Sequence, residues 1–354
     1  MKIAILNDTH CDVRNSADIF LENQTRFYTD TFFPYCIENN IKQVLHLGDY
    51  YDNRKQISVK AIGHNRKIFL DPLKENGMHM DIIPGNHDVY YKNTNNLCSL
   101  KEFLGHYMNN IHIIMEPTVL EYGSMKIGMV PWINNENYHS SVDWIQNTSA
   151  DILCAHLELS GFDMMRGVKS TTGMDASIFK RFEMVLSGHF HTKSQRDNIY
   201  YLGNQMELSW SDAGDPKFFH VLDTETRELT PVRNPNILFK KVVYNDRETD
   251  YNGMSVGEEF DNKFVKVVVV NKSDHFVFER YLDRIQSRKI HELKIAENFQ
   301  EFVGENVDDE GVDVEDTGQL LNTYIDNVDT DLDKNRIKNE MGDLMNEAQA
   351  LDIV

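Results

Sequence analysis

The sequence has few cysteines and no long hydrophobic run, and both absences exclude classes of protein. Its four cysteines are far apart: Cys11, Cys36, Cys98 and Cys154. None belongs to a Cys-x-x-Cys pair, which argues against a zinc knuckle and favours free thiols in a reducing compartment. The longest apolar run, near 265–270, is far shorter than the ~20 residues of a membrane helix. Four apolar residues after Met1-Lys2 are also fewer than the ~7 that a secretory segment needs. We expect a cytoplasmic protein with no membrane partner.

Positive charge is scarce as well, and unevenly distributed. The formal net charge is −20. Residues 297–354 contain 17 Asp and Glu but 3 Lys and Arg, a net of 3 − 17 = −14, so the preceding residues carry the remaining −6. The acidic end would repel phosphates, whereas the body of the chain can still form a local basic groove for a polyanion.

The order of strand-like and helix-like segments predicts an α/β fold, namely a two-sheet α/β sandwich with a small α/β cap domain and C-terminal helices. Short apolar runs alternate with helical stretches over the first 190 residues, which is typical of a layered α/β domain. Short strands follow between 199 and 243 (IYYLGN, KFFHVLD and LFKKVVY), and we expect them to form the second sheet. A strand at 263–270, a helix at 276–288 and a strand at 289–296 predict the small cap.

These patterns divide the chain into four parts. We expect a main domain at 1–244, a cap domain at 245–298, an acidic linker at 299–317 and a helical region at 318–354. The linker composition cannot bury enough apolar area to fold. The last region holds two amphipathic helices, which can either fold back on the body or dock on a partner.

Five short polar motifs lie where predicted strands end. They are Asp8-Thr9-His10, Gly48-Asp49, Gly85-Asn86-His87-Asp88, His156 with Glu158, and Gly188-His189-Phe190-His191. Ligands of open α/β sheets gather outside the carboxyl ends of the strands, so these side chains can converge although they span some 180 residues. Each motif is weak alone, but all five in this order indicate one site.

The residue types at these strand ends are those of a two-metal centre. Carboxylate and amide oxygens suit hard divalent cations, whereas imidazoles suit transition metals, so the mixture favours manganese or iron over magnesium alone. Two neighbouring cations need a bridging carboxylate, and Asp49 is placed for it after a glycine that permits a tight turn. In Asp8-x-His10 and His189-x-His191, the spacing on an extended segment points both side chains the same way. The other histidines are interpreted as surface or core residues.

The motifs resemble those of the calcineurin-like metallophosphoesterases, and more closely those of the SbcD-type nucleases of double-strand-break repair. Within that family they are most similar to the recombination endonuclease subunits of T4-like bacteriophages. Four further segments carry the resemblance: Tyr91-Lys92-Asn93, Val130-Pro131-Trp132, His156-Leu157-Glu158-Leu159, and Ser187-Gly188-His189-Phe190-His191-Thr192. The resemblance covers nearly the whole chain and implies a DNA exonuclease and endonuclease that processes double-strand ends for recombination and repair. A phage protein would act in the host-cell cytoplasm.

The resemblance also implies roles for single residues. One manganese would be held by Asp8, His10, Asp49 and His191, and the second by Asp49, Asn86, His156 and His189, with magnesium as a substitute. His87 would act on the scissile phosphate and Asp88 would orient His87. A hydroxide between the two cations would attack the phosphodiester.

Partners follow from the same resemblance. The cap would contact double-stranded DNA ends, and an SbcC-type coiled-coil ATPase would bind the C-terminal helices. A homodimer would form through a helix of the first domain, with these candidates: Leu97, Leu100, Phe103 and Leu104. Loop residues that could contact phosphates are Tyr91, Lys92, Arg166 and Lys169. The metal motifs alone leave two alternatives open, another metallophosphoesterase (a protein phosphatase or a cyclic-nucleotide phosphodiesterase) and a non-enzymatic scaffold.

Overall fold

The computed structural model describes residues 1–107, 109–165, 168–170 and 172–296, together with 325, 333–334 and 336–338. The chain divides into two compact units, Met1–Asn298 and Phe299–Val354. The predicted linker at 299–317, most of the predicted helical region at 318–354 and the DNA-contact candidate Arg166 lie outside the described residues. In the described part of the chain, no helix has both the length and the hydrophobicity that crossing a membrane requires.

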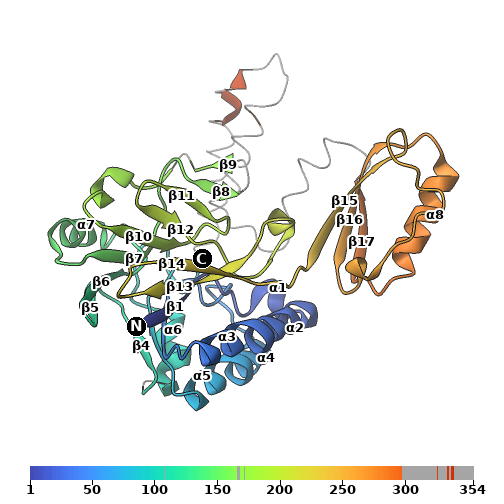
Figure 1. Ribbon diagram of the computed structural model, residues 1–354. Helices are drawn as coiled ribbons and strands as arrows, with labels where there is room; N and C mark the ends of the chain where they lie inside the picture. The colour runs from blue at the N-terminus through green and yellow to red at the C-terminus, as the bar shows by residue number, and fades with distance from the viewer. Residues whose placement is uncertain are drawn as a thin grey trace. The chain divides into compact units, whose positions relative to one another are not determined.

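The first unit contains two six-stranded sheets, as the α/β sandwich prediction requires (Figure 1). The order of the first sheet is β14-β13-β1-β2-β3-β4, and β1 to β4 run parallel to one another. Its strands are β1 (Lys2–Leu6), β2 (Gln43–His46), β3 (His79–Ile82), β4 (Ile111–Ile113), β13 (Phe218–Asp223) and β14 (Leu229–Arg233). The parallel strands place their carboxyl ends at one edge, where the predicted motifs begin.

The second sheet has the order β11-β12-β10-β7-β6-β5. Its strands are β5 (Thr118–Tyr122), β6 (Met125–Val130), β7 (Ile152–His156), β10 (Met184–Gly188), β11 (Ser194–Arg196) and β12 (Ile199–Tyr201). Strands β6, β7, β10 and β12 are parallel. The prediction that 199–243 forms this sheet is wrong in part: β12 belongs to it, but the KFFHVLD strand (β13) pairs with β1 of the first sheet. Local patterns define strands and leave their pairing open.

Alternating side chains of the central strands explain why the two sheets stack. In β1, Ile3 and Ile5 belong to the core between the sheets, whereas Ala4 and Leu6 belong to the core under the helices. All four are completely buried. A strand that is apolar on both faces must be covered on both faces, which the second sheet and a helical layer achieve.

The helical segments of the main domain lie between the strands in sequence (Figure 1). They are α1 (Val13–Ser16), α2 (Asp18–Phe27), η1 (Tyr28–Phe32), α3 (Phe33–Glu38), α4 (Val59–Asn65), η2 (Arg66–Leu70), α5 (Asp71–Glu75), α6 (Ser99–Leu104), η3 (Gly105–Tyr107), α7 (Tyr138–Asn147), η4 (Ala176–Phe179) and η5 (Trp210–Asp212). A short hairpin, β8 (Asp163–Met165) and β9 (Val168–Lys169), extends from the second sheet's loops. Aromatic side chains such as Phe27, Phe32 and Phe69 fill the space between helices and first sheet.

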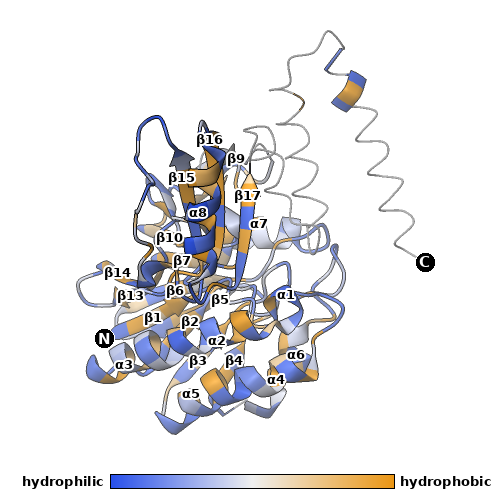
Figure 2. Cartoon of the chain, turned by 90° about the vertical axis from the view of Figure 1, so that its right-hand side faces the viewer, coloured by the Kyte–Doolittle hydropathy of each residue, from blue (hydrophilic) through white to orange (hydrophobic). Residues whose placement is uncertain are grey.

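A small three-stranded sheet follows, with one helix on it. It consists of β15 (Phe239–Asn245), η6 (Glu258–Phe260), β16 (Phe264–Asn271), α8 (His275–Gln286) and β17 (Glu292–Ala296), and all three strands are parallel. The α8 helix buries Phe278, Tyr281, Leu282 and Ile285, which share one helical face, while its hydrophilic face points away from the sheet (Figure 2). The LFKKVVY segment, expected in the sandwich, forms β15 instead.

Candidate metal centre

The seven predicted metal ligands lie at the carboxyl ends of five strands and form two clusters. Asp8, His10 and His191 form one group, and Asp49, His156 and His189 form the other; within each group the ligand atoms lie within 4.8 Å of one another. Asn86 lies beside the second group, 3.0 Å from each of its two imidazoles. Strands β1 and β10 supply the first group, while β2, β3, β7 and β10 supply the second.

The second group brings a carboxylate, a side-chain amide and two imidazoles to one point. His156 Nε2 lies 3.2 Å from Asp49 Oδ2 and 3.0 Å from the Asn86 side chain, which lies 3.0 Å from His189 Nδ1. The other ring nitrogen of His156 lies 2.8 Å from the carbonyl oxygen of Leu47. Because a carbonyl only accepts, that nitrogen carries a proton, and Nε2 is the ring atom that can bind a cation once its own proton has left.

The first group is held by contacts of its own. The Nε2 atoms of His10 and His191 face each other at 3.2 Å. The Asp8 carboxylate accepts the backbone N–H of His189 at 3.0 Å and the side-chain amide of Asn7 at 2.5 Å. The bond from His189 N–H therefore ties the strand end of one group to a ligand of the other.

The backbone at these ligands is left-handed, which corrects one prediction. Asp8, His10, Asp49 and His189 have φ of 48°, 41°, 54° and 90°. The expectation that Asp8 and His10 share an extended segment is therefore wrong, and their side chains converge through two left-handed residues instead. Such a conformation costs about 1–2 kcal/mol per non-glycine residue, and strain of this kind collects at functional sites.

Two glycines permit the loops of the second group to approach one another. A Cβ on Gly48, whose φ is +92°, would lie 2.6 Å from His156 Nδ1, and a Cβ on Gly85 would lie 2.2 Å from Asp49 Oδ1. Any side chain at either position would therefore displace a ligand. The tight turn predicted before Asp49 is present. The close approach of a second loop, however, explains the need for glycine at Gly48 as much as the turn does.

The donor set fits divalent cations. Neighbouring donor atoms in the second group lie 3.0–3.2 Å apart, and an octahedron with bonds of about 2.1 Å has edges of about 3.0 Å. Lone pairs crowded this closely repel one another unless protons or a cation lie between them. Carboxylate, amide and imidazole ligands together suit a transition metal such as manganese better than magnesium alone.

The pKa values of the metal-free chain show the same crowding. Burial opposes protonation of His10, but the carboxylates of Asp52, Asp49 and Asp8 outweigh it and raise the pKa of His10 to about 10. Burial likewise opposes protonation of His156, yet Asp49 raises the pKa of His156 to about 9. Burial lowers the pKa of His189 well below its usual value. Protons thus occupy positions beside the carboxylates that a cation would take.

His87 lies at the edge of this centre, and the structure gives it a different neighbour from the predicted one. Its backbone N–H donates to Asp49 Oδ1 at 2.8 Å, and its ring Nδ1 lies 2.6 Å from the carbonyl oxygen of Asp52. The carboxylate of Asp88 instead accepts the backbone N–H groups of Gly85, Tyr50 and Tyr51 at 2.9–3.2 Å. Asp88 therefore joins two ligand-bearing loops, and the Asp52 carbonyl orients the imidazole.

Asp52 is the residue that sequence reasoning missed. Its Oδ1 lies 3.0 Å from His10 Nδ1, so one residue contacts a predicted ligand through its carboxylate and His87 through its carbonyl. The Asp12 carboxylate holds its backbone N–H at 2.6 Å. The only sign of this role in the sequence is that an acidic residue stands three positions after Asp49, and which groups it contacts depends on how the loop folds.

Other predicted contact residues are distributed over the surface and the core. The Trp132 ring lies 5.4 Å from that of His189 and 5.8 Å from that of His156, so it forms a wall of the centre. Tyr91, Lys92 and Lys169 are exposed. Of the dimer candidates, Leu100 and Leu104 are buried core residues, which leaves Leu97 and Phe103, at 39% and 37% exposure, available to a partner.

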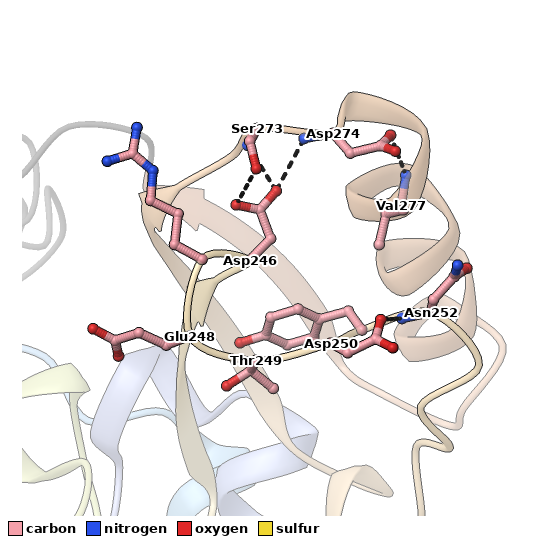
Figure 3. A pocket seen from close by; sticks show the side chains of 10 residues that line it. Asp246, Glu248, Thr249, Asp250, Asn252, Ser273, Asp274 and Val277 are labelled. Atoms are coloured by element: carbon pink, nitrogen blue, oxygen red, sulfur yellow. Dashed lines mark hydrogen bonds between the residues drawn. The ribbon is translucent and has the colours of Figure 1, made fainter.

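A separate cavity of about 370 Å³ lies in the small sheet's unit, at the carboxyl ends of β15 and β16 (Figure 3). Its lining includes Asp246, Glu248, Asp250 and Asp274 but a single basic residue, Arg247. Asp246 and Asp274 accept nearby backbone N–H groups, so both carboxylates already stabilise the surrounding loop and helix. This acidic lining would repel a nucleic-acid phosphate.

Comparison with known proteins agrees with this geometry. The model of the calcineurin-like phosphoesterases matches residues 1–193, which include every predicted metal ligand. Exonuclease subunit 1 of Enterobacteria phage T4 is 29% identical over 337 residues, 95% of either chain. The SbcD component of the SbcCD nuclease of Staphylococcus epidermidis is 30% identical over 101 residues, 27% of this chain and 26% of its own length.

Two solved structures are more distant. An archaeal phosphodiesterase is 16% identical, with a TM-score of 0.35, and the match covers 66% of this chain and 100% of that one. A protein of Thermus thermophilus is 12% identical, with a TM-score of 0.40, and the match covers 66% and 98%. These values are too low to support a conclusion about function.

Proposed function

Since the chain belongs to the calcineurin-like phosphoesterase family, we propose that it is an SbcD-like DNA nuclease with a two-metal centre that hydrolyses phosphodiester bonds at double-strand ends. The convergence of Asp49, Asn86, His156 and His189 at 3.0–3.2 Å carries this proposal, because a carboxylate, an amide and two imidazoles at one point have a cation as their natural partner. The full-length similarity to a phage exonuclease subunit supports DNA as the substrate.

The residues of the chain divide the metals between them. Asp8, His10 and His191 would hold one cation and Asn86, His156 and His189 the other, with Asp49 between them. Manganese fits this mixture of oxygen and imidazole donors. When bound, the two cations supply Lewis-acid activation of a water and charge neutralisation at the phosphate.

His87 acts on the leaving oxygen. Its Nδ1–H donates to the Asp52 carbonyl, so Nε2 is the ring atom through which His87 would act on the substrate. A protonated Nε2 gives its proton to the leaving 3′ oxygen, and a positioned general acid contributes about 10²- to 10⁴-fold in rate. The carbonyl of Asp52 accepts the Nδ1 proton and so holds the ring in one orientation.

The remaining parts extend the proposal beyond the metal centre. The cap at 245–298, which contains β16, α8 and β17, would contact DNA. The region at 318–354 would bind an SbcC-type ATPase, joined to the cap by the acidic segment at 299–317. Leu97 and Phe103 would take part in a homodimer. The name of the phage relative, a subunit, is consistent with a partner protein.

The test is cleavage of linear double-stranded DNA by the purified chain with Mn²⁺. We expect wild type to degrade DNA, His87→Ala to lose at least ~10²-fold in rate, and His139→Ala, at an exposed histidine, to act as wild type. Hydrolysis of bis-p-nitrophenyl phosphate without any DNA cleavage, even when an SbcC-type ATPase is added, would indicate another metallophosphoesterase. Equal activity of wild type and His87→Ala would contradict the role of His87.

A further inference from the structure

The two imidazoles of the second group are oriented by different contacts. Nδ1 of His156 lies 2.8 Å from the carbonyl oxygen of Leu47, and this bond fixes the plane of the ring. Among the described residues, the His189 ring makes one hydrogen bond, the 3.0 Å contact of Nδ1 with Asn86 on the side of the cation site. An imidazole that binds a metal is usually oriented by a bond from its other nitrogen to a carbonyl or a carboxylate. The His189 ring therefore needs another means of orientation.

Aromatic rings surround His189 in place of such a bond. The centroid of its ring lies 5.4 Å from that of Trp132, at an interplanar angle of 41°, and 4.9 Å from that of Phe190, at 35°. Both separations are typical of favourable ring pairs, which contribute about 0.5–1.5 kcal/mol each. Phe190 is the next residue in the chain and stacks on the buried ring of Tyr201, so Trp132 is the neighbour that a distant segment supplies. These rings limit the rotation of the imidazole.

The position of Trp132 is itself fixed through its backbone. Its carbonyl oxygen accepts the side-chain amides of Asn95 and Asn137 at 2.9 and 3.0 Å. Asn134 joins these two, because its side chain donates to Asn95 at 2.8 Å and its backbone N–H donates to Asn137 at 2.8 Å. We refer to the three as the asparagine cluster. The N–H of Trp132 donates to the carbonyl oxygen of Pro84 at 2.9 Å, in the loop after β3 that also carries a ligand of the second group.

We propose that Trp132 is a positioning residue of the metal centre, and that its indole, held by the asparagine cluster, fixes the orientation in which the His189 imidazole binds a cation. The inference rests on the proposed metal centre and adds to it a residue that acts through a ligand. Among the ring pairs of the described residues, Trp132 contacts the two imidazoles of the second group and neither imidazole of the first. Its effect should therefore fall on one cation of the two.

Equilibrium dialysis of Mn²⁺ against the full chain tests this. In Trp132→Leu we expect one Mn²⁺ equivalent to bind about 10- to 100-fold more weakly, the usual effect of losing the contact that orients a ligand, and the other to bind as in wild type. Trp132→Phe, which keeps a ring at the position, should recover most of the affinity. Trp144→Leu removes a half-buried tryptophan that packs in a different core cluster, and it should bind both equivalents as wild type does.

Two backgrounds identify the equivalent that is weakened. In His191→Ala, which keeps the second group, Trp132→Leu should weaken the remaining equivalent by the same factor. In His189→Ala, Trp132→Leu should leave the remaining equivalent unchanged, because the imidazole through which it acts is already absent. Asn95→Ala, which removes one of the two amides on the Trp132 carbonyl, should weaken the same equivalent by a smaller factor, and it provides the comparison if Trp132→Leu does not fold.

Unchanged affinity of Trp132→Leu for both equivalents would overturn the proposal. Equal weakening of both would do the same, because it would make Trp132 a residue of the core alone, and so would a loss in Trp132→Phe as large as that in Trp132→Leu. Wild type that binds no Mn²⁺ would overturn the metal centre and this inference with it. The substrate assignment is separate: wild type that binds two Mn²⁺ without cleaving DNA would count against the nuclease, whereas these variants test the orientation of His189 whatever the substrate.

Discussion

Lys217 is a buried lysine behind the metal centre, and its replacement by methionine tests how strongly the centre depends on it. The ammonium lies 2.6 Å from Asp212 Oδ1 and 3.0 Å from Asp215 Oδ2, and it donates to the carbonyl oxygen of His191 at 3.1 Å. Lys217 is 3% exposed and Asp212 2%. One lysine thus neutralises a buried carboxylate and holds the backbone of a predicted ligand.

The expected loss follows from this burial. Removal of one partner of a buried ion pair typically costs about 3–5 kcal/mol, because the other charge stays behind without compensation. At about 2–4 °C per kcal/mol for a domain of this size, Lys217→Met should lower Tm by roughly 6–20 °C. The double variant Asp212→Asn/Lys217→Met should recover part of that loss, since it leaves no isolated charge.

Urea unfolding and Mn²⁺ binding measure the two consequences separately. In Lys217→Met we expect weaker binding of one Mn²⁺ equivalent, at the His191 side, and an unchanged second equivalent. A stability loss below about 1 kcal/mol, the value of an exposed pair, would refute the claim that this pair is desolvated. Equal weakening of both equivalents would show that Lys217 acts on the whole fold and not on His191.

Three further predictions concern protons and single side chains. Among the described residues, neither ring nitrogen of His220 has a hydrogen-bond partner, and burial lowers the pKa of His220 to about 3. Below pH ~6.5 the unfolded chain therefore binds a proton that the folded chain does not, so the unfolding free energy of His220→Leu should rise by about 2 kcal/mol relative to wild type when the pH falls from 7.5 to 5.0. Urea unfolding measures this difference, and parallel plots of stability against pH for the two proteins would exclude it. The pKa values of His10 and His156 are raised to about 10 and 9, so Mn²⁺ must displace protons from both residues, and the affinity for Mn²⁺ should fall as the pH falls. Calorimetry in buffers of different ionisation enthalpy should show the release of about two protons per chain. Binding of Mn²⁺ that does not depend on pH would contradict this prediction. Asp88→Asn should cost about 2–3 kcal/mol, since three backbone N–H groups then compete for one acceptor oxygen, and a neutral effect on stability would mean that the two loops do not depend on this carboxylate.

Much of the fold could be predicted because it depends on local periodicity. The apolar strand cores and the amphipathic helix at 276–288 are set by side chains that alternate or recur within a few residues, and the structure has the helix at His275–Gln286. The strand partners were not predictable in the same way. The KFFHVLD strand joins β1 and the LFKKVVY strand starts the small sheet, because pairing is decided by packing between segments far apart in the sequence.

The sequence by itself determined which residue types gather at the strand ends, and therefore the chemistry of the centre. Asp49, Asn86 and His156 could be named because parallel strands bring their carboxyl ends to one edge. Only the tertiary structure decided what surrounds those residues. In the folded chain, Asp8 and His10 converge because both have left-handed backbone, and a backbone carbonyl, that of Asp52, orients the His87 ring. The guanidinium of Arg54 lies beside the Asn86 amide. A backbone carbonyl has no sequence signature, and the place of a loop side chain depends on the contacts that fix the loop, so these features exist only once the chain is folded.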